Sequence, residues 1–191
     1  MTKKIKVLAL FGESGSGKDA IQTWLLKNIP NTHKPITYTT RPARDYEING
    51  KNYYFISNDE FKELKNNNKI LESFYVKDRD WYYGSSIDEF QKDKINIIIL
   101  TPTGINNILN YNQLDILPVY IKAPDKIRLL RSLKREENPD CIEICRRFLS
   151  DAEDFKNINF LYETYNNISN SYEDILKDSI ITTWLLLGSD N

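Results

Sequence analysis

Residues 6–20 of the chain have the sequence KVLALFGESGSGKDA. The apolar run at 7–11 has the length and composition of a buried strand, and it ends at Gly12, where a turn able to adopt positive backbone angles begins. Glycines then alternate with small polar residues as far as Lys18, and a helical pattern of apolar residues follows. The stretch therefore predicts a strand, a loop and a helix in direct succession.

The loop between these two elements fits the spacing G-x-x-x-x-G-K. In such a loop the amide N–H groups converge on phosphate oxygens, and the following helix points its positive N-terminal end at the same anion. The lysine supplies a mobile charge for the outer phosphates of a nucleoside triphosphate. A flexible Gly-Ser turn is the alternative, but a position between a strand and a helix favours phosphate binding. The predicted triphosphate site consists of Gly12, Glu13, Ser14, Gly15, Ser16, Gly17, Lys18, Asp19 and Ala20.

Asp19 stands where this motif usually has serine or threonine. The hydroxyl group at that position normally contacts Mg²⁺, and a carboxylate is an equally hard oxygen ligand. We therefore expect Asp19 to reach the metal directly or through water.

The overall composition gives no sign of a nucleic-acid or lipid partner. At 191 residues the chain is long enough for one domain, with or without inserted subdomains. Its formal net charge of −1 provides no basic surface for nucleic acid or for an anionic membrane. We therefore expect small-molecule partners and neither nucleic acid nor membrane.

No segment of the chain indicates export. The longest apolar runs, at 95–100 and 180–187, are too short to cross a bilayer, and the first residues lead straight into a strand without a signal-peptide core. Cys141, Cys145 and the single histidine are too few for a metal site, so we expect reduced thiols that serve as packing residues. These features predict a cytoplasmic protein.

The rest of the chain alternates strands and helices. Further core strands are expected at 95–101, 116–123 and 160–165, with helices between them. This alternation predicts an α/β fold with a mostly parallel central sheet and right-handed crossovers. Pro118 suggests an irregular start or a sheet edge, and Asp125 is expected to cap the next helix.

Residues 34–92 interrupt this alternation and predict a small α+β insertion. The strand at 52–56 is expected to pair back across the Asn49-Gly50 turn. A short helix at 58–66 follows, with Asn58 as its expected cap. Two more strands are expected at 70–74 and 81–83.

Arginines and tyrosines cluster within this insertion. The guanidinium groups of Arg41 and Arg44 and the phenol hydroxyls of Tyr53 and Tyr83 together suit a dianionic phosphate monoester. Taken singly, an arginine of this kind is more often a solvated surface charge. Their clustering next to a phosphate loop favours a binding site.

A second group of arginines lies further along the chain. Arg131 and Arg135 are four residues apart on one expected helix, and Arg146 follows the polar segment around Pro139. A salt-bridged helix is one interpretation, since three glutamates lie nearby. The other is a lid that carries arginines onto a transferring phosphoryl group and excludes water.

At this point the sequence resembles one family. Residues 39–55 read TTRPARDYEINGKNYYF and match, at every fixed position, the monophosphate-binding signature of guanylate kinases, T-T-R-x-x-R-x-x-E-x-x-G-x-x-Y-x-F. The phosphate loop also matches that family except at Asp19, residues 83–85 resemble its Y-G-[ST] element, and residues 131–146 resemble its lid. The resemblance covers roughly residues 5–175.

The resemblance implies a three-layer P-loop kinase fold in a single domain. Its core would comprise residues 1–33, 93–135 and 143–191, its monophosphate-binding insertion residues 34–92, and its helical lid residues 136–142 with the flanking helix ends. The acceptor nucleotide would be held by Thr37, Arg41, Arg44, Tyr53, Glu72, Tyr83, Ser85 and Thr101.

Three of these positions, Thr37, Glu72 and Ser85, fall where family members contact guanine. A carboxylate at Glu72 can accept hydrogen bonds from N1–H and the exocyclic amine of guanine, and adenine offers no such donor pair. Thr101 stands where the family has an acidic residue, and the loop between Glu72 and Tyr83 is longer than usual. A changed or broadened base preference is therefore an alternative.

These features together predict an Mg²⁺-dependent kinase that transfers the γ-phosphoryl group of ATP to GMP or dGMP. The residues expected around the transferring group are Lys18, Arg41, Arg131, Arg135 and Arg146. Two alternatives remain: a kinase of the same fold with another phosphorylated acceptor, and a non-catalytic guanylate-kinase-like binding module. The protein is expected to be a monomer or a homodimer.

Overall fold

The computed structural model describes residues 4–43, 47–135, 137–168 and 171–186. Its centre is a five-stranded parallel sheet with the order β2-β7-β1-β8-β9. The strands are β1 (Ile5–Phe11), β2 (Thr32–His33), β7 (Ile95–Ile99), β8 (Leu114–Lys122) and β9 (Glu163–Asn166). The expected α/β fold with a mostly parallel sheet is confirmed.

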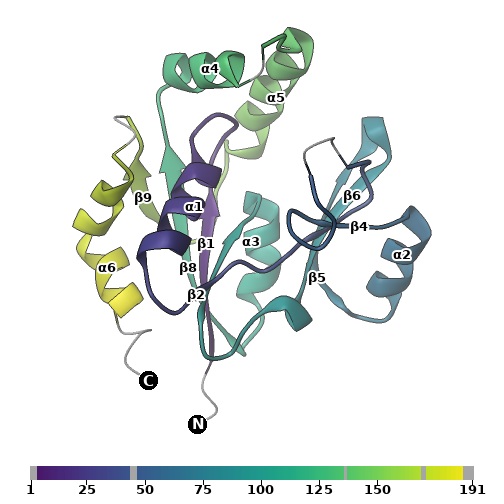
Figure 1. The fold of residues 1–191 in the computed structure, drawn as a ribbon, viewed down its shortest axis with the longest axis horizontal. Helices are drawn as coiled ribbons and strands as arrows, with labels where there is room; N and C mark the ends of the chain where they lie inside the picture. Colours follow the sequence, from purple (N-terminus) through teal and green to yellow (C-terminus); the bar gives the residue numbers. More distant parts are fainter. Residues whose placement is uncertain (1–3, 44–46, 136, 169–170, 187–191) are drawn as a thin grey trace.

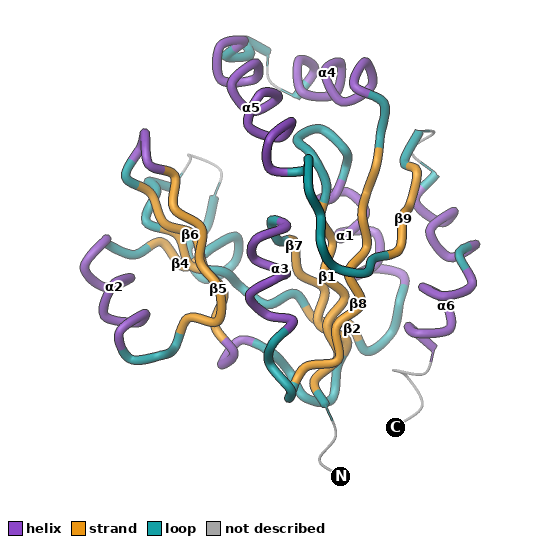
Figure 2. The backbone as a smooth tube through the Cα atoms, turned by 180° about the vertical axis from the view of Figure 1, so that it is seen from behind, coloured by secondary structure: helices purple, strands orange, loops and turns teal. Residues whose placement is uncertain are grey.

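Helices cover both faces of this sheet because the central strands are apolar on both faces. Leu8 and Leu10 of β1 belong to a core cluster with α1 (Lys18–Asn28) and α6 (Ser179–Leu186). Val7 and Ala9, which alternate with them, belong to a second cluster with α3 (Pro102–Leu109). Figures 1 and 2, which view the molecule from opposite sides, show α1 on one face and α3 on the other.

A second, smaller sheet stands beside the first, with the order β4-β3-β6-β5. Its strands are β3 (Tyr38–Thr39), β4 (Tyr54–Phe55), β5 (Ile70–Val76) and β6 (Trp81–Ser86), and α2 (Asn58–Asn66) packs against it. Short 3-10 helices follow β5 and β6, at Lys77–Arg79 and Ile87–Glu89. Two further helices, α4 (Asp125–Lys134) and α5 (Cys141–Asp154), lie above the central sheet in Figure 1.

The pairing of β4 differs from the expected hairpin. β4 runs parallel to β3, with Tyr38 opposite Tyr54. The Asn49-Gly50 turn closes locally instead, because the N–H of Gly50 donates to the carbonyl of Tyr53 at 2.8 Å. After the turn the chain therefore runs parallel to β3 instead of antiparallel to it.

Three smaller expectations were wrong. The cap of α2 is Ser57, which forms a capping box with Glu60. Asp125 is the first residue of α4, and its carboxylate accepts from Arg128 instead of capping. Pro118 lies inside the sheet, opposite Ala9, one residue before the pairing of β8 with β9 begins.

The C-terminal elements and the cysteines also differ in detail. The last strand, β9, covers Glu163–Asn166 rather than 160–165, and a 3-10 helix at Tyr172–Lys177 and then α6 follow it. Cys141 and Cys145 are free but exposed on α5, so they are not packing residues. Within the described ranges, every helix is too short or too polar to cross a membrane.

Candidate functional site

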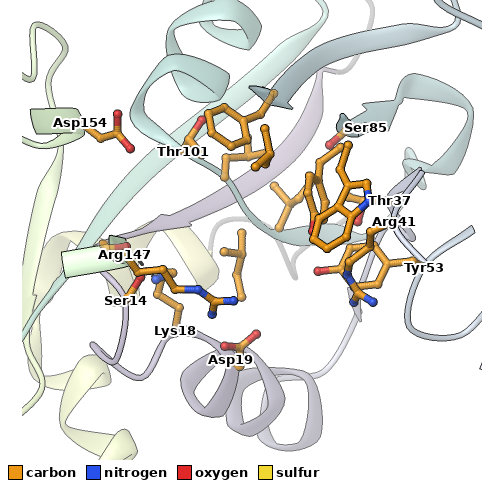
Figure 3. Close-up of a pocket in the computed structure, with 18 of the residues that line it drawn as sticks. Ser14, Lys18, Asp19, Thr37, Arg41, Tyr53, Ser85, Thr101, Arg147 and Asp154 are labelled. Atoms are coloured by element: carbon orange, nitrogen blue, oxygen red, sulfur yellow. Dashed lines mark hydrogen bonds between the residues drawn. The ribbon is translucent and has the colours of Figure 1, made fainter. Parts of the chain in front are cut away.

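A cleft of about 760 Å³ lies where the central sheet, the small sheet and α5 meet. Figure 3 shows Ser14, Lys18 and Arg147 on one side of it and Thr37, Arg41 and Tyr53 on the other. The sequence-predicted residues that line it are Gly12, Ser14, Lys18, Asp19, Thr37, Arg41, Tyr53, Glu72, Tyr83, Ser85, Thr101, Arg135 and Arg146. Arg44 lies outside the described residues.

The phosphate loop connects β1 to α1 at one end of this cleft. Its last glycine, Gly17, has a left-handed backbone conformation with φ of 96°. A Cβ atom there would lie 2.3 Å from the side-chain nitrogen of Asn167, so both the backbone angle and the space demand glycine. The junction between the loop and α1 is therefore tightly packed.

Lys18, the first residue of α1, turns its side chain back into this loop. Its ammonium group donates to the carbonyl of Gly12 at 2.7 Å and to that of Glu13 at 3.0 Å. Burial lowers the pKa of Lys18, while the carboxylates of Asp19, Asp151 and Glu13 act in the opposite direction. The cation is therefore held by backbone oxygens, among acidic groups, at the surface of the cleft.

Arg131 supports the loop from outside the cleft. Its guanidinium group donates to the carbonyl of Ser16 at 3.3 Å and to that of Asn167 at 3.1 Å. The side chain of Asn167 also donates to the carbonyl of Ser16, at 2.8 Å. Arg131 is absent from the residues that line the cleft, in contrast to Arg135 and Arg146.

On the opposite side, Arg41 is fixed by an acidic partner. Its guanidinium group donates to both carboxylate oxygens of Glu47, from Nη1 at 2.6 Å and from Nη2, and both side chains are less than a tenth exposed. The rings of Tyr53 and Phe55 lie 5.1 Å and 5.4 Å from it. The hydrogen bond to Glu47 raises the pKa of Arg41, so the arginine is a permanent, oriented cation.

Two tyrosines complete this side. The rings of Tyr53 and Tyr83 meet edge to face at 6.2 Å. Burial raises the pKa of Tyr53, so its hydroxyl group keeps the proton with which it can donate to an anion. Arg41, Tyr53 and Tyr83 therefore place one cation and two phenols around the same part of the cleft.

A buried carboxylate, that of Glu72, lies on β5, which pairs with the strand that carries Tyr83. Glu72 is 7 % exposed and accepts a hydrogen bond of 2.6 Å from the hydroxyl of Ser85. Burial raises the pKa of Glu72, and the hydrogen bonds from Ser85 oppose that rise. Thr101 caps α3 nearby by accepting from the N–H of Gly104 at 3.0 Å, and a Cβ on Gly104 would lie 2.8 Å from a Glu72 oxygen.

One face of the β5–β6 hairpin forms a continuous wall of the cleft. The cleft-lining residues at alternate positions are Glu72, Phe74 and Val76 on β5, opposite Ser85, Tyr83 and Trp81 on β6. Arg79 at the hairpin tip lies 5.7 Å from the Trp81 ring. Sequence reasoning missed Trp81 and Arg79, although period-two alternation on both strands could have indicated them.

Three polar residues of α5 meet at the cleft opposite this hairpin. The carboxylate of Glu143 accepts from Arg146 at 2.7 Å and from Arg147 at 2.8 Å. These arginines lower the pKa of Glu143 to about 2. Arg147, which the motif comparison had not singled out, therefore lines the cleft beside Arg146.

Comparisons with known proteins identify the family and agree with the fold. The family model described as guanylate kinase matches residues 4–180. A guanylate kinase of Wigglesworthia glossinidia brevipalpis is 30 % identical over 184 residues, which is 91 % of this chain and 88 % of that protein. A guanylate kinase of Mycoplasma mobile is 33 % identical over 184 residues, 86 % of this chain and 90 % of that protein. The crystal structure of guanylate kinase from Anaplasma phagocytophilum, at 22 % identity, has the same fold with a TM-score of 0.65 over 100 % of this chain and 90 % of that one.

Proposed function

Because this chain belongs to the guanylate kinase family, a family of phosphotransferases, we propose that it transfers the γ-phosphoryl group of ATP to GMP or dGMP. The products are ADP and GDP or dGDP. The observation that carries the proposal is that Lys18 of the phosphate loop and Arg41 of the small sheet line one cleft. Two phosphate-binding groups that face one space suit transfer between two bound nucleotides.

The donor binds at the phosphate loop. Loop amides and the start of α1 receive the phosphates of ATP, and Lys18 exchanges its contacts with Gly12 and Glu13 for the outer phosphates. Arg131 acts through the loop, because it donates to the carbonyls of Ser16 and Asn167 and does not line the cleft.

A magnesium ion accompanies ATP in this proposal. The described residues contain no cluster of three or more acidic, histidine or cysteine side chains that could hold a metal on its own. The exposed carboxylate of Asp19 lines the cleft beside Lys18, which fits an ion held by one carboxylate together with phosphate oxygens and water. The ion neutralises charge on the phosphates when bound.

The acceptor binds against the small sheet. Arg41, Tyr53 and Tyr83 hold its phosphate, with Arg44 as a further proposed contact, and Glu72 with Ser85 recognises guanine. Thr37 and Thr101 also line the cleft. Residues 34–92 thus act as the acceptor-binding insertion of a single domain.

Transfer itself needs charge neutralisation and exclusion of water rather than a general base. The acceptor phosphate oxygen is already a competent nucleophile near neutral pH. Arg135 and Arg146 approach the phosphoryl group from the other side of the cleft, as parts of a lid around residues 136–142. For this, Arg146 exchanges the Glu143 carboxylate for the phosphoryl group, so that one anionic partner replaces another.

A panel of acceptors tests the proposal. Ribo- and deoxynucleoside monophosphates of all bases, together with a ribose phosphate, are incubated with Mg-ATP, and ADP formation is measured. The expected result is the highest kcat/KM with GMP or dGMP. Higher activity with another acceptor would overturn the substrate assignment, and no activity with any acceptor would favour a binding module.

A further inference from the structure

The peptide groups of Ser14, inside the phosphate loop, are held by two side chains from the helices above the sheet. The N–H of Ser14 donates to Asp151 of α5 at 2.7 Å, and the carbonyl of Ser14 accepts from Arg128 of α4 at 3.0 Å. Arg128 also donates to the same oxygen of Asp151, at 3.0 Å. The three residues form a closed triangle of hydrogen bonds that joins the loop to both helices.

Within this triangle Arg128 is buried and the side chain of Asp151 is 14 % exposed, so their charges are weakly screened. Arg128 is 4 % exposed and has the Phe148 ring 4.5 Å from its guanidinium carbon. Its other acidic neighbours are Asp125 at 2.8 Å and Glu13 at 3.7 Å. Hydrogen bonds that involve charged groups contribute more than neutral ones in such surroundings.

The main chain of the loop also lies directly against α4 at this point. A Cβ atom on Gly15 would lie 2.4 Å from the carbonyl oxygen of Arg128, and Gly15 has φ of 77°. The loop therefore touches Arg128 through both its backbone and its side chain. A shift of α4 or α5 relative to the loop would have to break these contacts.

The same pair acts electrostatically on Lys18. The Asp151 carboxylate raises the pKa of that lysine and the Arg128 guanidinium lowers it, in addition to the effect of burial. Asp151 itself lines the cleft. The pair is therefore close enough to the loop cation to affect the environment in which phosphates bind.

From these contacts we infer that Asp151 and Arg128 are positioning residues for the phosphate donor. Their ion pair fixes the Ser14 peptide groups, and thereby couples the conformation of the phosphate loop to the docking of α4 and α5. The inference rests on the proposed function, in which this loop binds ATP. Neither residue belongs to the loop motif, and neither is assigned to the reaction above.

Two substitutions of Asp151 on the full chain test the inference, with Asp125→Ala as the matched control. Asp125 pairs with the same arginine, but its side chain is 87 % exposed and lies outside the triangle of Ser14, Asp151 and Arg128, so its removal should leave ATP binding within about twofold. Asp151→Ala should weaken ATP binding, measured by calorimetry, by about tenfold or more. Asp151→Asn keeps the shape and one acceptor oxygen, so an intermediate loss is expected. GMP binding should stay within about twofold in all variants, because the small sheet is untouched.

The inference is overturned if folded Asp151→Asn binds ATP as the wild type does, if GMP binding falls in parallel, or if Asp125→Ala loses as much as Asp151→Ala. A second readout needs no nucleotide: hydrogen exchange at the Ser14 amide should be faster in the Asp151 variants than in the wild type. Unchanged exchange also overturns the inference. If the wild type fails to bind ATP, the proposed function fails, and amide exchange still decides whether Asp151 positions the loop.

Discussion

The two sides of the cleft are built from different parts of the polypeptide. Around Lys18, the contacts mostly involve the main chain of the loop: Gly12 and Gly15 pack against neighbouring backbone, and loop carbonyls accept from the side chains of Lys18, Arg128 and Arg131. Around Arg41, the contacts join side chain to side chain, as in the pairs Arg41–Glu47 and Ser85–Glu72. A site made of main chain suits the phosphates that all nucleotides share, whereas a site made of side chains can distinguish one base from another.

The two sheets that support these sides also differ, in the length and burial of their strands. β1 is a seven-residue strand whose residues from Val7 to Phe11 are completely buried. β3 and β4 have two residues each, and the side chains of β4 are only partly buried. The side proposed to bind the donor is therefore attached to the main core, while the side proposed to bind the acceptor depends on local polar pairs. Substitutions on the two sides should have separable effects.

The largest effect is expected from Lys18→Met. Loss of the loop cation should reduce kcat on the order of 10³-fold, because the charge that develops on the transferring group loses its neutralising partner. GMP binding, measured by calorimetry, should change little. Lys27→Met, an exposed lysine of the same helix, is the matched control. A parallel loss of GMP affinity would show that the two sides of the cleft are not separable.

Arg41→Ala should affect the other side. The KM for GMP should rise on the order of 50-fold while the affinity for ATP is retained, since a guanidinium contact with the phosphate is lost. The free energy of unfolding should also fall by about 3 kcal/mol, because the buried Glu47 carboxylate loses its cation. The double variant Arg41→Ala with Glu47→Gln should regain stability, measured by urea denaturation, but not GMP affinity. Recovery of both would contradict a direct role of Arg41.

The smallest of these effects is expected from Glu72→Gln, at about tenfold in the KM for GMP, with weaker discrimination against AMP. Burial raises the pKa of Glu72, so the ionised form is disfavoured in the folded protein and the neutral glutamine should not reduce stability near neutral pH. In the wild type, GMP affinity should fall as the pH drops through that raised pKa, because the protonated acid accepts fewer hydrogen bonds. If Glu72→Gln also lost GMP affinity as the pH fell, the titration would belong to another group.

Local sequence was sufficient for the parts of the site that are contiguous in the chain. The strand, the loop and α1 were predicted from residues 6–20, and Arg41 with its partner Glu47 lies within one motif. Contacts between distant residues left no such signal: Ser14 and Asp151 are 137 positions apart, and Ser16 and Asn167 are 151 apart. The roles inferred for Asp151 and Asn167 follow only from the packing of α5, and of the residue that follows β9, against the loop.

Where local reasoning was wrong, longer-range contacts explain the outcome. The Asn49-Gly50 turn is a common hairpin signal, yet the N–H of Tyr54 donates to Thr37 and β4 joins β3 in parallel. Pro118 was consistent with a sheet edge, but β8 is an interior strand whose partner β9 begins one residue later. The placement of Arg131 behind the loop likewise depends on Asn167, which the helix pattern alone did not indicate.

The contact between Gly104 and Glu72 has a geometric consequence for the whole molecule. There α3 of the central sheet approaches β5 so closely that a methyl group would not fit, and Tyr111 donates to the carbonyl of Leu71 beside it. If the small sheet rotates about this contact, Glu72 moves least, and the end of the β5–β6 hairpin that carries Trp81 moves most. A base held at Glu72 would keep its contacts during such a rotation, while the tip of the hairpin moves toward α5.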